Sequence, residues 1–208
     1  GDRPSNVRHN RRRVADALGI PPFATSRQPH GSRVSGVGGG RAGAGFHRPW
    51  RALRRPDALA TTRPRTPVAV LAADCVPLVL ASKREGRLVA VHAGWRGLAA
   101  GILARAVRRF SRPADVRAAI GPAIGPCHYE IDVPVAQAVE AGTGRAMTEQ
   151  RRDGLFLDLP ATTEAALRAS GVDVVERSLD CTACQPDRFF SHRRDGSTGR
   201  QALIAMRL

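Results

Sequence analysis

Two side chains that can bind a metal ion or act as a nucleophile lie close together in the centre of this sequence. Residues 73–97 read ADCVPLVLASKREGRLVAVHAGWRG and contain a thiol, Cys75, and an imidazole, His92. Cysteine thiolates and imidazoles are preferred zinc ligands. A helix that starts directly after His92 offers free backbone N–H groups, which favour anions such as phosphate. The stretch therefore predicts a metal or nucleophile site beside an anion-binding helix start.

A third ligand must come from elsewhere in the chain, because a catalytic zinc usually has three protein ligands and one open position. His30 lies in a Pro-His-Gly turn, which presents its side chain on a loop. His47, in a glycine-rich segment, is a weaker candidate. Spacing alone leaves a second interpretation open, in which Cys75 is a core thiol and His92 a hydrogen-bonded residue at a strand end. The candidates for the third ligand are His30, His47, His128 and His192.

Two further groups of cysteine and histidine are less specific. The sequence IGPAIGPCHYEID repeats Ile-Gly-Pro and then offers Cys127 and His128. Two Gly-Pro pairs turn the backbone sharply, which suits the wall of a pocket. Cys181-x-x-Cys184 is a single pair without a second pair, so it supports a structural zinc or a redox motif only weakly.

Three arginines are candidates for binding phosphate. Arg96 lies in the first turn of the helix expected after His92. Arg193 and Arg194 precede Asp195 near the end of the chain. A guanidinium group binds phosphate through two hydrogen bonds, so this run is either a phosphate clamp or a solvated charged loop.

The elements that position these residues follow from the periodicity of apolar side chains. An apolar stripe of Leu98, Ile102, Ala106 and Phe110 predicts one helix over residues 95–110. The polar turn KREGR predicts that the two strands around it pair antiparallel. Other helices are expected at residues 4–18, 133–141 and 160–170, and strands at 68–73, 77–82, 88–94, 172–179 and 201–207, with 155–159 a strand or the approach to a helix.

Helices and strands mix without the strict alternation of a doubly wound fold. This order predicts an α+β fold of mixed α/β layers, in which central mixed β-sheets are flanked by helices. With 208 residues and 42% hydrophobic content, residues 1–208 fit a single domain. Residues 38–50 are glycine-rich without the context of a dinucleotide site, so we expect a flexible loop there.

The formal charge of +15 suggests nucleic acid, but its distribution argues against it. Lys83 is the only lysine, and the arginines are spread from end to end. Only 4% of residues are aromatic, which leaves little to stack on bases. We therefore expect nucleic acid not to be the partner. The lack of a long apolar run and of a signal sequence predicts a cytoplasmic protein with no membrane contact, and four cysteines argue against a disulfide scaffold.

The sequence resembles the laccase-domain family, also called YfiH-type multicopper polyphenol oxidase or purine nucleoside phosphorylase proteins. The matching segments are RQPHG, PDALATT, ADCVPLVL, VHAGWRGLAAGIL, IGPAIGPCHYEI and FFSHRRDGSTGRQ, from one end of the chain to the other. Pro29 stands where the family usually has Val. Family members also have an earlier strand and an Arg-Gly-Gly loop, so we expect this sequence to lack that N-terminal strand.

The resemblance implies a YfiH-like fold and a zinc ion bound by His30, Cys75 and His92. It implies phosphorolysis of purine nucleosides such as adenosine, inosine and methylthioadenosine, with some adenosine deamination. The partners would then be a small nucleoside and phosphate, bound by a monomer or homodimer. Phosphorolysis needs a positive field for phosphate, which Arg96 and the helix start would supply together with Arg193 or Arg194.

Other interpretations remain open at this point. The expected catalytic residues are Cys75, His92 and Arg96. We also suggest Cys127 or His128 as the acid that protonates the leaving base, although no motif supports this assignment. A hydrolase that cleaves an amide in a cell-wall precursor, with Cys75 or zinc-activated water as nucleophile, is an alternative. Copper polyphenol oxidation fits less well, because it needs several copper sites and more ligands than six scattered histidines.

Overall fold

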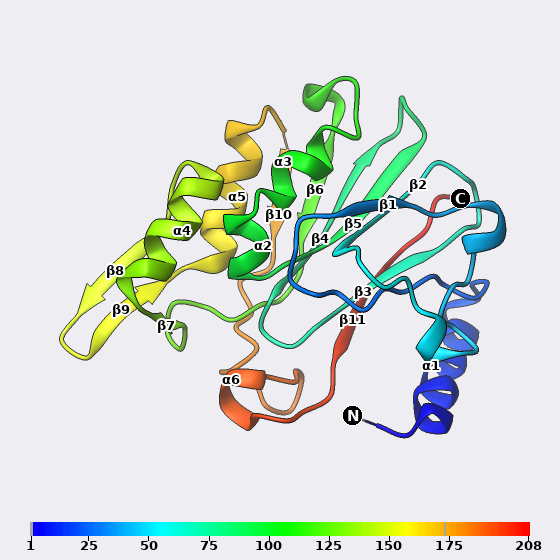
Figure 1. The fold of residues 1–208 in the computed structure, drawn as a ribbon, viewed down its shortest axis with the longest axis horizontal. Helices are drawn as coiled ribbons and strands as arrows, with labels where there is room; N and C mark the ends of the chain where they lie inside the picture. Colours follow the sequence, from blue (N-terminus) through cyan, green and yellow to red (C-terminus); the bar gives the residue numbers. More distant parts are fainter. Residues whose placement is uncertain (1, 173) are drawn as a thin grey trace.

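A mixed six-stranded sheet forms the centre of the computed structural model, which describes residues 2–172 and 174–208 (Figure 1). Its inner strands pair antiparallel, and the two outermost pairs are parallel. This arrangement confirms the expected mixed sheet and the antiparallel pair around the KREGR turn. In sheet order the strands are β1 (Val34–Gly36), β2 (Ala58–Thr61), β5 (Arg87–Ala93), β4 (Val76–Ser82), β6 (Arg117–Ile120) and β10 (Val174–Arg177).

The central strands are buried on both faces because each face packs against a different layer. Val89 and Val91 of β5 pack with Leu98 and Ile102, from the helices α2 (Trp95–Ala99) and α3 (Ile102–Val107). The alternate residues Leu88 and Ala90 pack against the two-stranded sheet of β3 (Val68–Ala72) and β11 (Gln201–Ala205). The alternation of side chains along a strand explains why these sequences are almost continuously apolar.

The remaining elements lie around this core (Figure 1). The β8–β9 hairpin projects at one end of the molecule, and α1 lies at the other. Among the described residues no helix combines the length and apolar character needed to cross a membrane. These elements are α1 (Pro4–Leu18), η1 (Gly39–Arg41), η2 (Pro49–Arg51), η3 (Pro113–Asp115), β7 (Glu130–Ile131), α4 (Val133–Thr143), β8 (Thr148–Arg151), β9 (Gly154–Leu157), α5 (Leu159–Ala169) and α6 (His192–Asp195).

The prediction of one helix over residues 95–110 is wrong. The chain forms α2 and α3 instead, and Gly101 between them has φ +76°, a left-handed conformation that ends a helix. The apolar stripe continues across the break, because Leu98, Ile102, Ala106 and Phe110 are all buried. Periodicity therefore found the buried face but not the interruption.

The structure adds to the sequence predictions in three further regions. The glycine-rich residues 38–50 contain two short 3-10 turns, and Phe46 is buried with its ring 4.9 Å from that of Phe23, so the segment has regular structure and core contacts. Strand β2 was not expected from the sequence. The predicted strand over 172–179 is present as β10, and its residue 173 lies outside the described residues.

Gly142 allows α4 to lie directly against α2, the helix whose first turn carries Arg96. A Cβ atom there would collide with the carbonyl oxygens of Leu98 and Ala99. Replacement of glycine by alanine within a helix normally stabilises a protein by about 0.5–1 kcal/mol. At Gly142 the collision reverses the sign, because the two helices must move apart.

We therefore expect Gly142→Ala to lower the free energy of unfolding by about 1–3 kcal/mol, as overpacking does. Urea denaturation followed by circular dichroism measures the change. The control is Gly40→Ala, because a Cβ there meets nothing within 4 Å. A Gly142→Ala variant as stable as the control would contradict this account of the contact between the helices.

Candidate metal centre and substrate cavity

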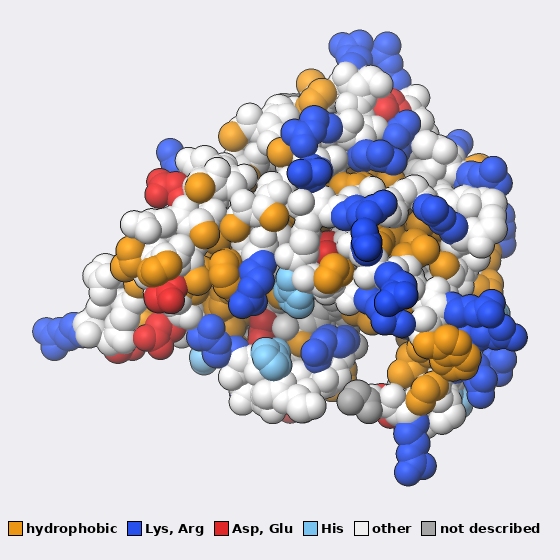
Figure 2. Space-filling model, in the orientation of Figure 1, with side chains coloured by type: hydrophobic (Ala, Val, Ile, Leu, Met, Phe, Trp, Pro, Cys, Tyr) orange, Lys and Arg blue, Asp and Glu red, His pale blue; other side chains and the backbone are white. Residues whose placement is uncertain are grey.

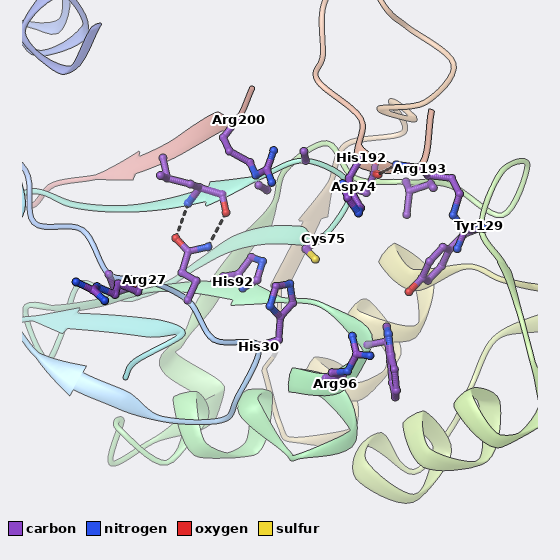
Figure 3. A pocket seen from close by; sticks show the side chains of 17 residues that line it. Arg27, His30, Asp74, Cys75, His92, Arg96, Tyr129, His192, Arg193 and Arg200 are labelled. Atoms are coloured by element: carbon purple, nitrogen blue, oxygen red, sulfur yellow. Dashed lines mark hydrogen bonds between the residues drawn. The ribbon is translucent and has the colours of Figure 1, made fainter. Parts of the chain in front are cut away.

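His30, Cys75 and His92 come together although they lie far apart in the sequence (Figure 3). Each offers one ligand atom, and these atoms all lie within 4.8 Å of one another. Cys75 directly precedes β4 and His92 lies near the end of β5; the antiparallel register pairs Pro77 with His92. His30 reaches this edge of the sheet from a turn in a loop. The centroid of its ring lies 4.9 Å from the centroid of the His92 ring.

Asp57, which precedes β2, positions both histidines. Its side chain is fully buried and accepts a hydrogen bond from His92 Nδ1 at 3.1 Å. It also accepts bonds from the backbone N–H groups of His30 at 2.9 Å and Gly31 at 2.8 Å. A carboxylate at Nδ1 fixes the tautomer of His92 and leaves Nε2 available to a metal, the arrangement common among metal-binding histidines.

The electrostatics of this group favour a thiolate. Burial alone would raise the pKa of Cys75, but hydrogen bonds with His30 and His92 outweigh it and lower the pKa to about 6. Burial would lower the pKa of His92, but Asp57 and Cys75 together raise it to about 9. Because the thiolate is the form that binds metal, the site favours the ligand form of Cys75 at neutral pH.

A cavity of about 530 Å³ opens beside these three residues. The volume lies within the range typical of small-molecule sites. Arg96 and Arg193 line it, as the sequence suggested, and so do Arg27 and Arg200, which sequence reasoning missed. Figure 3 shows Arg96 at one side of the cavity and Arg27 and Arg200 at the other.

Tyr129 is a second cavity residue that sequence reasoning missed. Its hydroxyl points toward the side of the cavity that carries Cys75 (Figure 3), and the guanidinium of Arg193 lies 5.1 Å from the centre of its ring. Burial, together with the nearby Cys75, raises the pKa of Tyr129 to about 12. The phenol therefore stays protonated at neutral pH and can donate a hydrogen bond into the cavity.

Asp74 connects the metal-ligand loop to the chain's C-terminal part. Its backbone has φ +90°, a conformation that is strained for a residue with a side chain. Its carboxylate accepts hydrogen bonds from Thr182 Oγ1 and from the Arg193 backbone N–H, both at 2.7 Å. These contacts hold Arg193 next to Cys75, although 118 positions separate the two in sequence.

Several expected site residues lie elsewhere. His47 is not in the ligand group and does not line the cavity. His192 lines the cavity but is not one of the three grouped ligands. Arg194 does not line the cavity; its guanidinium donates to the carbonyls of Thr182, Ala183 and Phe189 and pairs with Asp195.

Cys127 and His128 are not brought to the cavity either. They lie with Cys181 and Cys184 in a separate group. Their expected role as the acid stays a prediction without a contact to the cavity. The missed residues shared one signal, since each belongs to a family-matching segment: Asp57 to PDALATT, Arg27 to RQPHG, Tyr129 to IGPAIGPCHYEI and Arg200 to FFSHRRDGSTGRQ.

Basic side chains are spread over the face shown in Figure 2 and do not form one block. Histidine side chains lie near the middle of that face with basic groups beside them. The distribution agrees with the scattered arginines of the sequence. It favours local use of positive charge in a pocket over an extended basic surface.

Comparison with known proteins adds the family context. Residues 1–207 match a family model described as multi-copper polyphenol oxidoreductase laccase. A Xylella fastidiosa protein named purine nucleoside phosphorylase is 37% identical over 213 residues, which span 99% of this chain and 80% of that protein. Purine nucleoside phosphorylase YfiH of Escherichia coli K12 is 34% identical over 97% of this chain and 81% of its own length.

Solved structures agree with the fold. The crystal structure of YlmD from Geobacillus stearothermophilus superposes with a TM-score of 0.93 at 34% identity, and covers 100% of this chain and 83% of that one. A Bacillus licheniformis protein named YfiH superposes with a TM-score of 0.92, also at 34% identity. The likeness confirms the expected YfiH-like fold of mixed sheets flanked by helices.

Gly94 provides a test of the geometry that leaves every ligand in place. A Cβ atom at this position would lie 2.8 Å from Cys75 Sγ and 3.1 Å from His30 Cδ2, so both ligands would have to move. The backbone itself, with φ −83°, accepts alanine without strain.

We expect Gly94→Ala to weaken zinc binding at His30, Cys75 and His92 by about 10–100-fold, the usual effect of disturbing residues that orient metal ligands. Competition with a chelating dye measures the affinity. Gly40→Ala again serves as the matched control. Unchanged affinity in Gly94→Ala would show that these three side chains do not bind the metal together.

Proposed function

We propose a function from the premise that this chain belongs to the multi-copper polyphenol oxidoreductase laccase family. The function that the geometry supports best is zinc-dependent phosphorolysis of purine nucleosides such as adenosine, inosine and methylthioadenosine. The products are the free base and the corresponding ribose 1-phosphate. The observation that carries the proposal is a ligand group of two histidines and one cysteine at the side of a cavity lined by arginines. The relatives' name, purine nucleoside phosphorylase, supports it.

The donor set fits zinc. Two imidazoles and a thiolate are suitable zinc ligands, and a zinc ion held by these three residues would keep a fourth position for water or substrate. The Asp57 carboxylate accepts a hydrogen bond from the His92 ring nitrogen, and metal-bound histidines usually make such a bond. When bound, zinc supplies a Lewis acid with an open coordination position, which adenosine deamination would also require.

The arginines account for the phosphate. Arg96 and Arg193 line the cavity on the side of Tyr129, and Arg200 lines its other side. Guanidinium groups bind phosphate through paired hydrogen bonds and stay charged at any working pH. They would hold phosphate against C1′ of the ribose and screen its charge from the developing negative charge on the base.

The reaction breaks the bond between C1′ and the purine nitrogen and forms a bond between C1′ and a phosphate oxygen. The electron pair of the broken bond goes to the base, which must be stabilised by a hydrogen bond or a proton. Tyr129 is placed for the first of these, because its phenol stays protonated and faces the cavity. The positioning and charge stabilisation come from this chain's side chains, as in other sites where little covalent chemistry is required of the protein.

Copper oxidation, which the family description names, receives less support from the cavity. Copper electron-transfer sites with two histidines and one cysteine usually add a long methionine ligand. No methionine is among the described residues that line this cavity, and the room beside the ligand group suits a substrate. The hydrolase alternative differs in one observable: it does not require phosphate.

The first test of the proposal is phosphate dependence. We expect zinc-loaded protein to convert inosine to hypoxanthine only when phosphate is present, and His92→Ala to lose this activity together with the zinc of the cavity site. The control is His47→Ala, because His47 lies outside the ligand group. Hypoxanthine release and metal content are measured on the same samples. Full activity of metal-free protein would overturn the proposal, and turnover without phosphate would favour the hydrolase.

Tyr129 gives a second test, which separates binding from catalysis. Tyr129→Phe removes one hydroxyl and keeps the ring under Arg193. We expect kcat for inosine to fall by about 100–1000-fold, the usual effect of removing one donor to a developing negative charge, with a small change in KM. Steady-state kinetics at saturating phosphate measures both. An unchanged kcat would remove Tyr129 from the proposed chemistry.

A further inference from the structure

We propose that Cys127, His128, Cys181 and Cys184 bind a second zinc ion, which is structural and separate from the cavity. Their ligand atoms all lie within 4.8 Å of one another. Cys127 and His128 lie between β6 and β7, whereas Cys181 and Cys184 lie in the loop between β10 and α6. The proposal does not depend on the function proposed for the cavity.

The distances match a tetrahedral zinc site. With Zn–S near 2.3 Å and Zn–N near 2.0–2.1 Å, ligand atoms of a tetrahedral site lie about 3.5–3.8 Å apart. His128 Nδ1 lies 3.3 Å from Cys127 Sγ, 3.4 Å from Cys184 Sγ and 4.0 Å from Cys181 Sγ. Cys127 Sγ and Cys184 Sγ are 3.4 Å apart. The four atoms thus surround a space of the size that zinc needs.

The same geometry argues against a disulfide as the purpose of the group. All four cysteines of the chain are free, and a separation of 3.4 Å between two sulfurs is much longer than the bond of about 2.05 Å. A disulfide between Cys127 and Cys184 would leave Cys181 and the imidazole of His128 without a role. A metal ion uses all four.

The backbone around the sulfurs is arranged as it is around structural zinc. Cys181 Sγ accepts a hydrogen bond from the Gly125 N–H at 3.2 Å, a contact that stabilises a thiolate. A turn brings Cys184 back toward Cys181, since its N–H donates to the Cys181 carbonyl at 3.2 Å. Four protein ligands leave no open position, which is the property that separates structural from catalytic zinc.

The two segments have few other contacts to hold them together. The apolar cluster beside the site has only Ile124, Cys181 and Ala183 as its buried members. Among the described residues, the Thr182 N–H donates to the Ala123 carbonyl at 3.0 Å as an isolated bridge, and the Ser178 N–H donates to the Ile120 carbonyl at 2.9 Å where β6 and β10 end. A metal ion would supply the cross-link that this small cluster lacks.

The ion would also fix one wall of the cavity. Tyr129 follows His128 directly, and Arg193 donates to the backbone carbonyl of Glu130 at 3.1 Å. On the other segment, Thr182 donates to Asp74, next to Cys75. We therefore expect loss of this zinc to loosen Tyr129 and Arg193 without removing a ligand of the cavity metal.

Metal content of purified protein tests the proposal. We expect two zinc ions per chain in the wild type, measured by inductively coupled plasma mass spectrometry against protein concentration. Cys184→Ser should retain one ion, His92→Ala should retain the other, and the double variant should retain none. His47→Ala, with a histidine outside both groups, should keep two. Because each site is removed separately, failure of one proposal is distinguishable from failure of the other.

A ligand exchange guards against variants that merely misfold. His128→Ala should lose one of the two zinc ions and unfold at a lower temperature, whereas His128→Cys, which restores a fourth ligand, should bind two as the wild type does. Zinc content unchanged in both Cys184→Ser and His128→Ala would overturn the proposal. So would a wild-type chain whose intact mass shows a Cys127–Cys184 disulfide in place of zinc.

Discussion

The buried carboxylate of Asp57 is the interaction on which the arrangement of the site depends. It has no contact with solvent, and a buried charge is costly unless hydrogen bonds satisfy it. Three N–H groups do so, from the turn of His30 and Gly31 and from the ring of His92. One side chain therefore connects a loop to a sheet and orients two of the candidate metal ligands. Loss of any of these donors would leave a buried carboxylate oxygen with one hydrogen bond fewer, which destabilises the fold. Folding therefore favours the conformation that keeps both histidines in place.

The third ligand is placed by different means. Cys75 lies between the strained backbone of Asp74 and the first residue of β4, and the space beside its sulfur exists only because position 94 is glycine. The antiparallel register of β4 and β5 then puts the thiol near His92. The sheet thus sets the distance between Cys75 and His92, while the turn that carries His30 lies outside the sheet.

The sequence supported much of this, and the limits of the prediction have physical causes. The stretch from residue 73 to 97 was informative because the ligands and the strands that carry them are local to it. The sequence pattern did not reveal the break at Gly101, because the same apolar stripe runs through both helices and their buried faces look continuous. The environment of Asp57 could not be predicted, since it depends on contacts across 26 to 35 positions. The grouping of Cys127 with Cys184, 57 positions away, was likewise invisible, and the CxxC pair looked incomplete for that reason.

The cavity wall belongs to both ligand groups. The Ile124 N–H donates to the carbonyl of Asp74 at 2.9 Å. Asp74 directly precedes Cys75, and Ile124 lies three residues before Cys127. On the C-terminal side, Asp74 binds both Thr182, next to Cys181, and Arg193. Asp74 therefore receives the two segments that the second ligand group would cross-link. A displacement of either segment would reach Cys75 through one residue, because Asp74 accepts hydrogen bonds from both segments and directly precedes Cys75. The geometry of the candidate site and local stability then depend on the same few bonds in this part of the molecule.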